Sequence, residues 1–214
     1  MALNTRASLD NALREAIRIV SINVGRVETI LHAGKSHRTG IKKKPVEGPV
    51  EIAELGLAGD AVVDTRHHGG PDQAVYVYRT EDYDWWASQT GREFPYGLFG
   101  ENLSVSGLPA NLLVGDRLLI GDVLLEATSA RIPCGTLAAA MADSGFGMAF
   151  RQAERPGVYF RVLNPGYVSS GDAITMVESD GSSVSVLDLF RFAYQTSYDA
   201  DELRKLLEAP IAER

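Results

Sequence analysis

The sequence predicts a mainly β protein of the α+β class, a mostly antiparallel barrel or sandwich with a few inserted helices. Two observations lead to this class. Short β-branched or alternating runs recur through the middle of the 214-residue chain, separated by turns that contain glycine or proline. Apolar residues at helical spacing occur in short stretches between these runs and near the two ends.

The first third of the chain begins with a predicted helix and continues as strands. Apolar residues three and four apart predict a short amphipathic helix over 8–18. The runs 19–24, 27–31 and 50–55 have the composition of strands. Residues 32–48 are rich in lysine, arginine and glycine, which favours a mobile or ligand-ordered basic loop, or simply a solvated one.

The middle of the chain alternates strands with short helices. Residues 74–78 form a predicted strand, and a helix follows over 80–90 and stops at Gly91. The clearest hairpin joins 117–120 to 123–127, because Gly121 stands first in a two-residue turn. The remaining predicted elements are helices over 136–141 and 148–154 and strands over 158–163 and 173–178.

Three segments follow from this pattern: an N-terminal helical extension over 1–18, a main domain over 19–178 and a C-terminal helical segment over 184–214. Helical spacing from Val186 to Ala193 and again over 199–208 predicts two helices in the last segment. A tail of roughly 30 residues is too small to build its own core. It must therefore dock on the main body or on a partner.

Composition excludes several classes of function. The chain has 28 acidic and 21 basic side chains, a net charge of −7, which argues against general binding to nucleic acid. No apolar run reaches the roughly 18 residues of a membrane span, and the charged N-terminus lacks a secretory signal. The one cysteine, Cys134, fits a reducing compartment. We therefore expect a cytoplasmic protein with neither nucleic-acid nor membrane partners.

A dense polar motif lies over 59–74. It places Arg66, His67 and His68 beside Gly69 and Gly70, and such a cluster can bind an anion or transfer protons near neutral pH. The alternative is a polar loop whose glycines only allow a tight turn. Adjacent histidines on an extended segment point to opposite faces, so a shared metal ion is disfavoured.

Cys134 is a candidate nucleophile or metal ligand. It follows a predicted strand and stands at the expected start of a helix, near Arg131. Both features lower the pKa of a thiol, and the thiolate is the nucleophile and the soft-metal ligand. The alternative is a small buried apolar residue.

Two further segments carry polar side chains that could bind a ligand. Asn102 and Ser104 could hydrogen-bond the polar edge of a ring, or they could simply cap the start of a strand. Arg161 lies in an otherwise apolar strand and needs an anionic partner if it faces inward. If it faces outward, it carries no functional information.

Five motifs in one order resemble those of MOSC-domain proteins, named after the C-terminal domain of molybdenum cofactor sulfurases, and of their YiiM-like subgroup. Linked motifs are far more specific than any one of them. The resemblance covers roughly residues 19–178, and the tail resembles the small three-helix extension of that subgroup. The motifs are Gly-Leu-Ala-Gly-Asp at 56–60, Arg-His-His-Gly-Gly-Pro-Asp at 66–72, Phe-Gly-Glu-Asn-Leu at 99–103, Pro-Cys at 133–134 and Gly-Val-Tyr-Phe-Arg-Val-Leu at 157–163.

The resemblance implies a MOSC-type β-barrel that binds the molybdenum cofactor, a pterin with a dithiolene and a phosphate. It implies that Cys134 is the protein ligand of molybdenum and that the protein reduces N-hydroxylated compounds such as N-hydroxylated purine bases. The phosphate needs cationic or amide donors. The candidates for cofactor binding are Arg66, Gly69, Gly70, Asn102, Ser104, Arg131, Arg161 and the basic run Lys42 to Lys44.

In the implied reaction the metal carries out two-electron chemistry, and His67 or His68 donates the proton that releases water from a cleaved N–O bond. A reductase of this kind needs a separate electron-donor protein, and a homodimer is a further possibility. The alternative is a non-catalytic carrier that uses Cys134 to hold sulfur as a persulfide or to hand over the cofactor. A third, weaker hypothesis is a cysteine-histidine hydrolase that uses Cys134 and His68.

Overall fold

The computed structural model describes residues 16–32, 34–66, 68–179 and 183–212. Eight strands form one sheet, in which β7 and β8 are parallel and all other neighbours are antiparallel. In sheet order they are β13 (Thr175–Val177), β9 (Arg117–Ile120), β10 (Val123–Ala130), β11 (Val158–Asn164), β7 (Val75–Arg79), β8 (Leu103–Ser106), β1 (Arg18–Gly25) and β4 (Lys43–Pro45).

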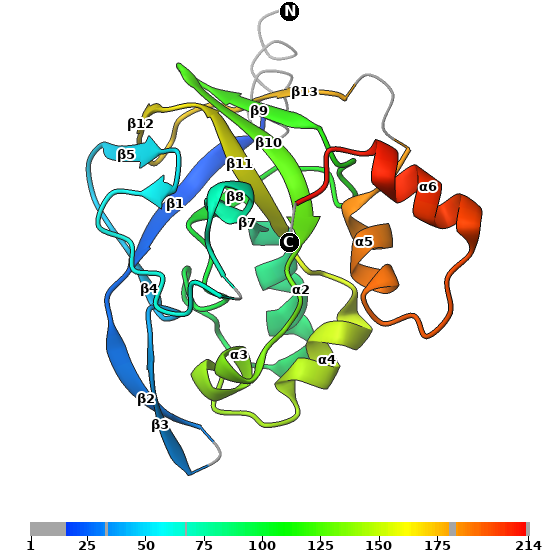
Figure 1. Cartoon of the computed structure of the whole chain (residues 1–214). Helices are drawn as coiled ribbons and strands as arrows, with labels where there is room; N and C mark the ends of the chain where they lie inside the picture. The colour runs from blue at the N-terminus through cyan, green and yellow to red at the C-terminus, as the bar shows by residue number, and fades with distance from the viewer. Residues whose placement is uncertain (1–15, 33, 67, 180–182, 213–214) are drawn as a thin grey trace, which may run out of the picture.

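Helices and two small sheets surround the large one (Figure 1). A three-stranded sheet has the order β12 (Gly166–Val168), β5 (Val50–Ala53) and β6 (Gly56–Leu57), and β2 (Glu28–His32) pairs with β3 (Lys35–Thr39) in a projecting hairpin. The helices are η1 (Pro71–Gln73), a 3-10 turn, and α2 (Thr80–Thr90), α3 (Gly135–Ala140), α4 (Phe146–Ala153), α5 (Val186–Phe192) and α6 (Ala200–Glu208).

The expected mainly β, α+β class is confirmed. The eight-stranded order has two edges, β13 and β4, so the strand pairing among the described residues does not close a barrel. Apart from residues 32–48 and the N-terminal helix, the predicted elements are found with ends shifted by at most three residues. Gly121 has φ of 56° in the β9–β10 turn, a conformation that side-chain-bearing residues rarely adopt.

The prediction of a loop over 32–48 is wrong, because this segment contains β3 and β4. The polar run of β3 has no apolar alternation, yet its backbone pairs with β2 in an exposed hairpin. β4 pairs with the end of β1, where Lys43 lies opposite Gly25. The predicted helix over 8–18 lies mostly outside the described residues, and Arg18 already belongs to β1.

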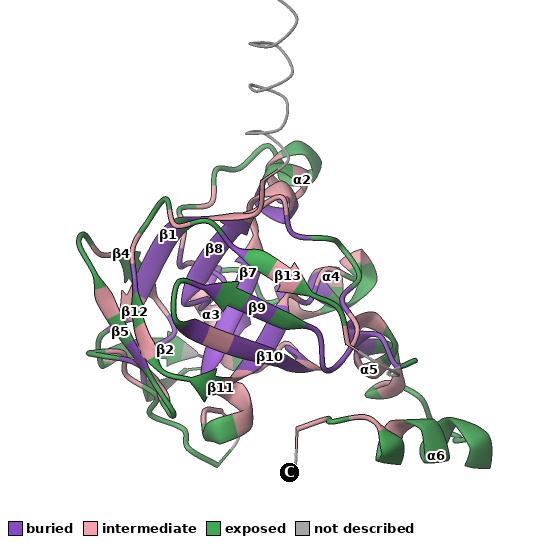
Figure 2. Cartoon of the chain, turned by 90° about the horizontal axis from the view of Figure 1, so that it is seen from above, coloured by how far each residue is buried: buried purple, intermediate pink, exposed green. Residues whose placement is uncertain are grey.

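The core is an aromatic cluster between the sheet and α2. Phe99 is fully buried and stacks on Tyr78 with ring centroids 4.5 Å apart. Trp86 of α2 and Phe150 of α4 pack against the same ring. Figure 2 shows that β1, β7 and β8 are almost wholly buried, whereas α6 is largely exposed. The sheet is therefore part of a rigid, close-packed layer.

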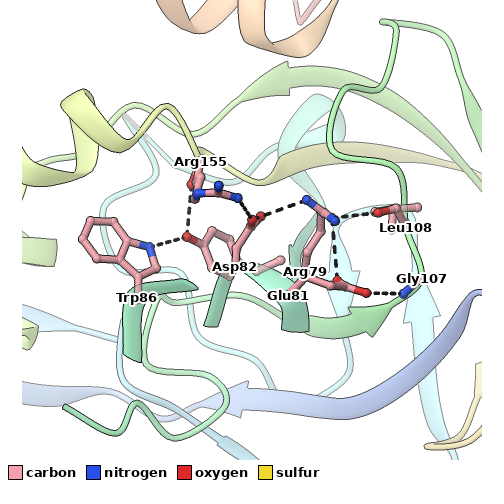
Figure 3. Close-up of polar contacts among 8 residues, drawn as sticks. Arg79, Glu81, Asp82, Trp86, Gly107, Leu108 and Arg155 are labelled. Carbon is pink, nitrogen blue, oxygen red and sulfur yellow. Dashed lines mark hydrogen bonds and ion pairs between the residues drawn. The ribbon is translucent and has the colours of Figure 1, made fainter. Parts of the chain in front are cut away.

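A polar network joins the start of α2 to two neighbouring loops (Figure 3). Arg79 and Arg155 flank the buried Asp82, at 3.4 and 2.5 Å. Burial raises the pKa of Asp82, and the charge of Arg79 and the hydrogen bond from Arg155 oppose that rise. Arg79 also donates to the carbonyl of Leu108, so the network ties the helix to the segment after β8.

The C-terminal tail packs on the body of its own chain. Val186 and Phe190 of α5 are buried, and the Phe190 ring meets that of Phe150 edge-on at 6.3 Å. By contrast, Leu207 of α6 is 82% exposed. The tail therefore adds to the main core through α5, while α6 presents mostly polar surface.

Replacing Phe190 by alanine tests this docking. We expect Phe190→Ala to lower the free energy of unfolding by about 3–5 kcal/mol, because it leaves a cavity in the core. The matched control Leu207→Ala removes an exposed side chain and should change it by less than about 0.5 kcal/mol. Urea unfolding followed by circular dichroism measures both, and equal small effects would contradict a docked α5.

Candidate functional site

One cavity of ≈ 220 Å³ brings together distant parts of the chain. Its walls come from β3 and β4, from the loop over 60–69, from β7 and from the junction between β10 and α3. Cationic and titratable side chains dominate its polar lining: His37, Arg38, Lys43, Asp60, Asp64, His68, Arg131 and Cys134. The cavity is therefore a candidate site for a negatively charged ligand.

Cys134 lies at the junction between β10 and α3. Its backbone is extended, with φ of −120°, and it caps the start of α3. Burial alone would raise the pKa of the Cys134 thiol, but a hydrogen bond from His68 and the charge of Arg131 lower this pKa to about 6. At neutral pH the side chain is therefore mainly a thiolate, the form that binds soft metals and acts as a nucleophile.

Arg131 supplies a buried positive charge beside the thiolate. It is 4% exposed, and its guanidinium lies 5.1 Å from the centre of the Tyr76 ring. Among the described residues, no carboxylate forms an ion pair with it, and its Nε atom has no hydrogen-bond partner. A buried cation needs a nearby negative charge, which the Cys134 thiolate supplies in part, and the unpartnered Nε can also donate to an anionic group of a ligand.

Gly100 makes room for this arginine. Its φ is +80°, and a Cβ atom there would stand 3.1 Å from Nη1 of Arg131 and 3.2 Å from Cγ1 of Ile41. A side chain at this position would be strained and would push against the guanidinium. Steric crowding thus explains why the second position of the Phe-Gly-Glu-Asn-Leu motif is a glycine.

Asn102, Asp60 and Lys43 form a second polar group in the cavity. The Asn102 amide donates to Asp60 at 2.9 Å and accepts from the backbone N–H of Tyr76 at 3.1 Å. The Lys43 ammonium donates to Oδ2 of Asp60, the same oxygen that accepts from Asn102, and forms an ion pair with Asp60. Asn102 therefore lines the cavity, but both ends of its amide bind protein.

A fully buried carboxylate lies beneath this group. Glu101 accepts hydrogen bonds from Tyr83 at 2.5 Å, from the backbone of Gly97 at 2.7 Å and from Ser104 at 2.7 Å. Burial raises the pKa of Glu101, although these hydrogen bonds oppose the rise. Ser104 is fully buried, accepts from Asn23 at 3.1 Å and does not line the cavity. This network adjoins the cavity through Asn102, the residue after Glu101, which lines the cavity.

The structure separates the predicted site residues into two groups. Cys134, Arg131, Asn102, His68 and Gly69 line the cavity together. The other described candidates do not line it: Arg66, Gly70, Ser104 and Arg161. His67 lies outside the described residues. Of the basic run, Lys43 lines the cavity, while Lys44 is exposed and Lys42 pairs with Glu28 at 3.7 Å.

Arg161 has other partners. Its guanidinium forms an ion pair with Asp72 at 3.0 Å and lies 3.5 Å from Glu126. It also donates to the carbonyls of Pro210 and Ile211, both at 3.1 Å. The anionic partner that the sequence requires for this arginine is therefore a carboxylate of the chain itself.

Sequence reasoning missed the pairing of Lys43 with Asp60. Both residues stand in segments that it singled out, the basic run and the Gly-Leu-Ala-Gly-Asp motif, but 17 positions separate them. Among the described residues, no three His, Cys, Asp or Glu side chains are placed to share a metal ion. Among the described residues that line the cavity, Cys134 is the one soft ligand that the site offers a metal.

The fold and the site together define an α+β protein with a cavity lined by cationic side chains and one cysteine. The model of the MOSC domain matches residues 64–175, and the chain belongs to the MOSC-domain family. This domain is associated with binding of the molybdenum cofactor. No helix in the described parts of the chain has the length and apolar character needed to span a bilayer.

Three known proteins are similar to the chain. YflK of Bacillus subtilis, an uncharacterized protein, is 32% identical over 202 residues, 94% of this chain and 91% of YflK. A protein of Gibberella moniliformis named "Reductase" is 27% identical over 200 residues, 91% of this chain but 35% of that protein. The crystal structure of YiiM from Geobacillus stearothermophilus has a TM-score of 0.74 and 29% identity, covering 91% of this chain and 92% of YiiM.

Alkylation of Cys134 by iodoacetamide measures the predicted thiolate. In cofactor-free protein the rate should rise with pH to a plateau, with a midpoint at about 6. His68→Gln removes a hydrogen bond that stabilises the thiolate, so its midpoint should move to higher pH. Arg204→Gln, a change in exposed α6, is the control. A midpoint near that of a free thiol in the wild type would contradict the described environment.

Glu101→Gln tests the buried carboxylate through the pH dependence of stability. Because the folded-state pKa of Glu101 is raised, its contribution to stability is present below the unfolded-state pKa and is lost as pH rises through the folded-state pKa. The difference in Tm between Glu101→Gln and wild type should therefore become more positive from pH 4.5 to pH 8. The exposed Glu93→Gln is the control. A difference that does not vary with pH would refute the raised pKa.

Proposed function

We propose that this protein reduces N-hydroxylated compounds, such as N-hydroxylated purine bases, at a molybdenum cofactor whose metal is ligated by Cys134. The observation that carries the proposal is the juxtaposition of a low-pKa thiol with a buried arginine that has no carboxylate partner among the described residues. A soft thiolate matches molybdenum, and a guanidinium matches the phosphate of the pterin.

The residues present fit this cofactor. Cys134 would ligate the metal, and Arg131 would bind an anionic group of the cofactor. When bound, the molybdenum cofactor supplies a centre for two-electron redox chemistry. Arg38 of β3 adds a further positive charge to the lining of the cavity. Such a local positive field in a chain of net charge −7 attracts a small anion.

We propose a different role for His68 from the proton donation that its motif first indicates. Its imidazole hydrogen-bonds to the sulfur of Cys134 and lowers the pKa of the thiol. We therefore assign His68 to holding the thiolate in place. The proton donor to the substrate must then be sought elsewhere on the cavity wall.

A separate electron-donor protein completes the proposal. The Gibberella moniliformis relative carries the name "Reductase", and this chain spans 35% of its length. That protein therefore contains a large additional part with no counterpart in this chain. We propose that a separate protein supplies the electrons here. The homodimer and the cytoplasmic location stay predictions from the sequence.

The carrier and hydrolase alternatives make different predictions. A carrier predicts no turnover, and its persulfide form would also use the reactive Cys134. The hydrolase requires an imidazole within reach of Cys134, and His68 meets that condition. Two observations favour the molybdenum-dependent reaction over both: Arg131 is buried with no carboxylate partner among the described residues, and the MOSC domain is associated with the molybdenum cofactor.

Metal content and turnover test the proposal together. Wild type produced in a host that makes the cofactor should contain molybdenum by elemental analysis, and it should reduce an N-hydroxylated purine base with reduced viologen dye as electron donor. Cys134→Ala should lose the metal and the turnover, because Cys134 is the one cysteine of the chain. Arg131→Gln should retain less cofactor, whereas the matched surface change Arg204→Gln should behave as wild type.

The outcomes separate the three hypotheses. Metal without turnover of any N-hydroxylated base would favour the carrier. Turnover of an ester or thioester by metal-free protein, lost in both Cys134→Ala and His68→Gln, would favour the hydrolase. Equal molybdenum in wild type and Cys134→Ala would refute ligation by Cys134.

A further inference from the structure

Lys43 is a buried ammonium group on the cavity wall. Its side chain is 7% exposed, and it lines the cavity from β4. Within the described part of the chain, the Asp60 carboxylate is its only hydrogen-bond acceptor. An ammonium has three N–H donors, so one binds Asp60 and two remain for a ligand in the cavity.

Asp60 is itself held in place by the main chain and by Asn102. One carboxylate oxygen accepts from the backbone N–H of Gly25 at 2.7 Å. The other accepts from the Asn102 amide at 2.9 Å and from Lys43. The Asn102 amide is fixed in turn by the Tyr76 N–H at 3.1 Å. The carboxylate that binds the ammonium is therefore held by hydrogen bonds to the end of β1 and, through Asn102, to β7.

The surroundings make this ammonium a better acid than a solvated lysine. Burial lowers the pKa of Lys43 from its ordinary value, and the Arg131 charge lowers it further, while Asp60 and more distant Glu101 oppose the fall. The other titratable or charged groups that face it across the cavity are His37, Arg38, Asp64, His68, Cys134, Tyr76 and Tyr159. A lowered pKa eases proton transfer near neutral pH.

We propose that Lys43 is the general acid of the reduction: it protonates the oxygen that leaves when the N–O bond of the substrate breaks. Asp60 and Asn102 are positioning residues that aim its ammonium into the cavity. This inference rests on the proposed function. It gives the proton-donor role to Lys43 because the His68 imidazole is engaged with the Cys134 sulfur.

The step is balanced as follows. The N–O bond breaks with uptake of two electrons from the external electron donor, and these become a lone pair on nitrogen. The leaving oxygen, already bearing one hydrogen, takes a proton from Lys43 and departs as water. The nitrogen takes its proton from solvent, and solvent also reprotonates Lys43. The net change is R₂N–OH plus two electrons and two protons to R₂NH and water.

The cofactor-free protein provides the first test. In protein labelled with ¹³C at Cε of lysine, the NMR signal that is absent from Lys43→Arg belongs to Lys43. The Lys43 signal should titrate at lower pH than the signals of the other lysines. Asp60→Asn removes the neighbouring negative charge, so the Lys43 titration should move to lower pH still. A Lys43 signal that titrates with the surface lysines would overturn the inference.

The loaded enzyme provides the second test, with reduced viologen dye and an N-hydroxylated purine base. Lys43→Arg keeps the charge but holds its proton too tightly, so kcat should fall by about 100-fold with little change in KM. The alkaline fall of kcat in wild type should be absent from Lys43→Arg and should shift to lower pH in Asp60→Asn. Lys44→Arg, an exposed neighbour on the same strand, is the matched control.

The results distinguish failure of this inference from failure of the proposed function. If loaded wild type turns over the substrate and Lys43→Arg does so at the same rate with the same pH profile, Lys43 is not the acid, while the proposed function stands. If loaded wild type does not turn over N-hydroxylated compounds at all, the proposed function fails and the role of Lys43 fails with it. Tm and molybdenum content of each variant establish that fold and cofactor are retained.

Discussion

The burial of two positive charges in the cavity is the constraint on which the site depends. Arg131 and Lys43 are both withdrawn from water, and among the described residues only Asp60 forms an ion pair with either of them. Removing a cation from water without an anion nearby is strongly unfavourable. The Arg131 guanidinium is held in place beside Gly100 and the Tyr76 ring. An anionic ligand would compensate its charge. The thiolate of Cys134 supplies part of the same compensation.

The polar residues of the Phe-Gly-Glu-Asn-Leu motif act as a scaffold for these charges. Glu101 accepts three hydrogen bonds next to the cavity. The Asn102 amide donates to Asp60 and accepts from the Tyr76 N–H, so both of its ends bind protein. These hydrogen bonds make the network rigid, although Oε2 of Glu101 has no hydrogen-bond partner among the described residues. That rigidity, rather than contact with a ligand, explains why an acid and an amide stand side by side at the start of β8. The sequence could show their polarity but not their partners.

The sequence is sufficient to predict most strands and helices, because glycine turns and apolar periodicity are local signals. It failed over 32–48, where the exposed β2–β3 hairpin is held by backbone pairing without an apolar face. At the site, Cys134 and Arg131 are three residues apart on one β–α junction, so their association could be inferred locally. Two other features depend on strand pairing between distant parts of the chain, which local patterns do not encode. These are the contact between Lys43 and Asp60 and the carboxylate partner of Arg161.

Arg161 shows how the tail takes part in building the cavity wall. Its guanidinium joins Asp72 of η1 to the carbonyls of Pro210 and Ile211. Thr128 adds a second link, because its hydroxyl donates to the carbonyl of Asp72 at 2.6 Å while its own carbonyl accepts from the N–H of Ala212. Since η1 ends at Gln73, which lines the cavity, the C-terminal segment supports one wall of the site from behind. An arginine in an apolar strand is thus explained by connection between the tail and the site rather than by contact with a ligand.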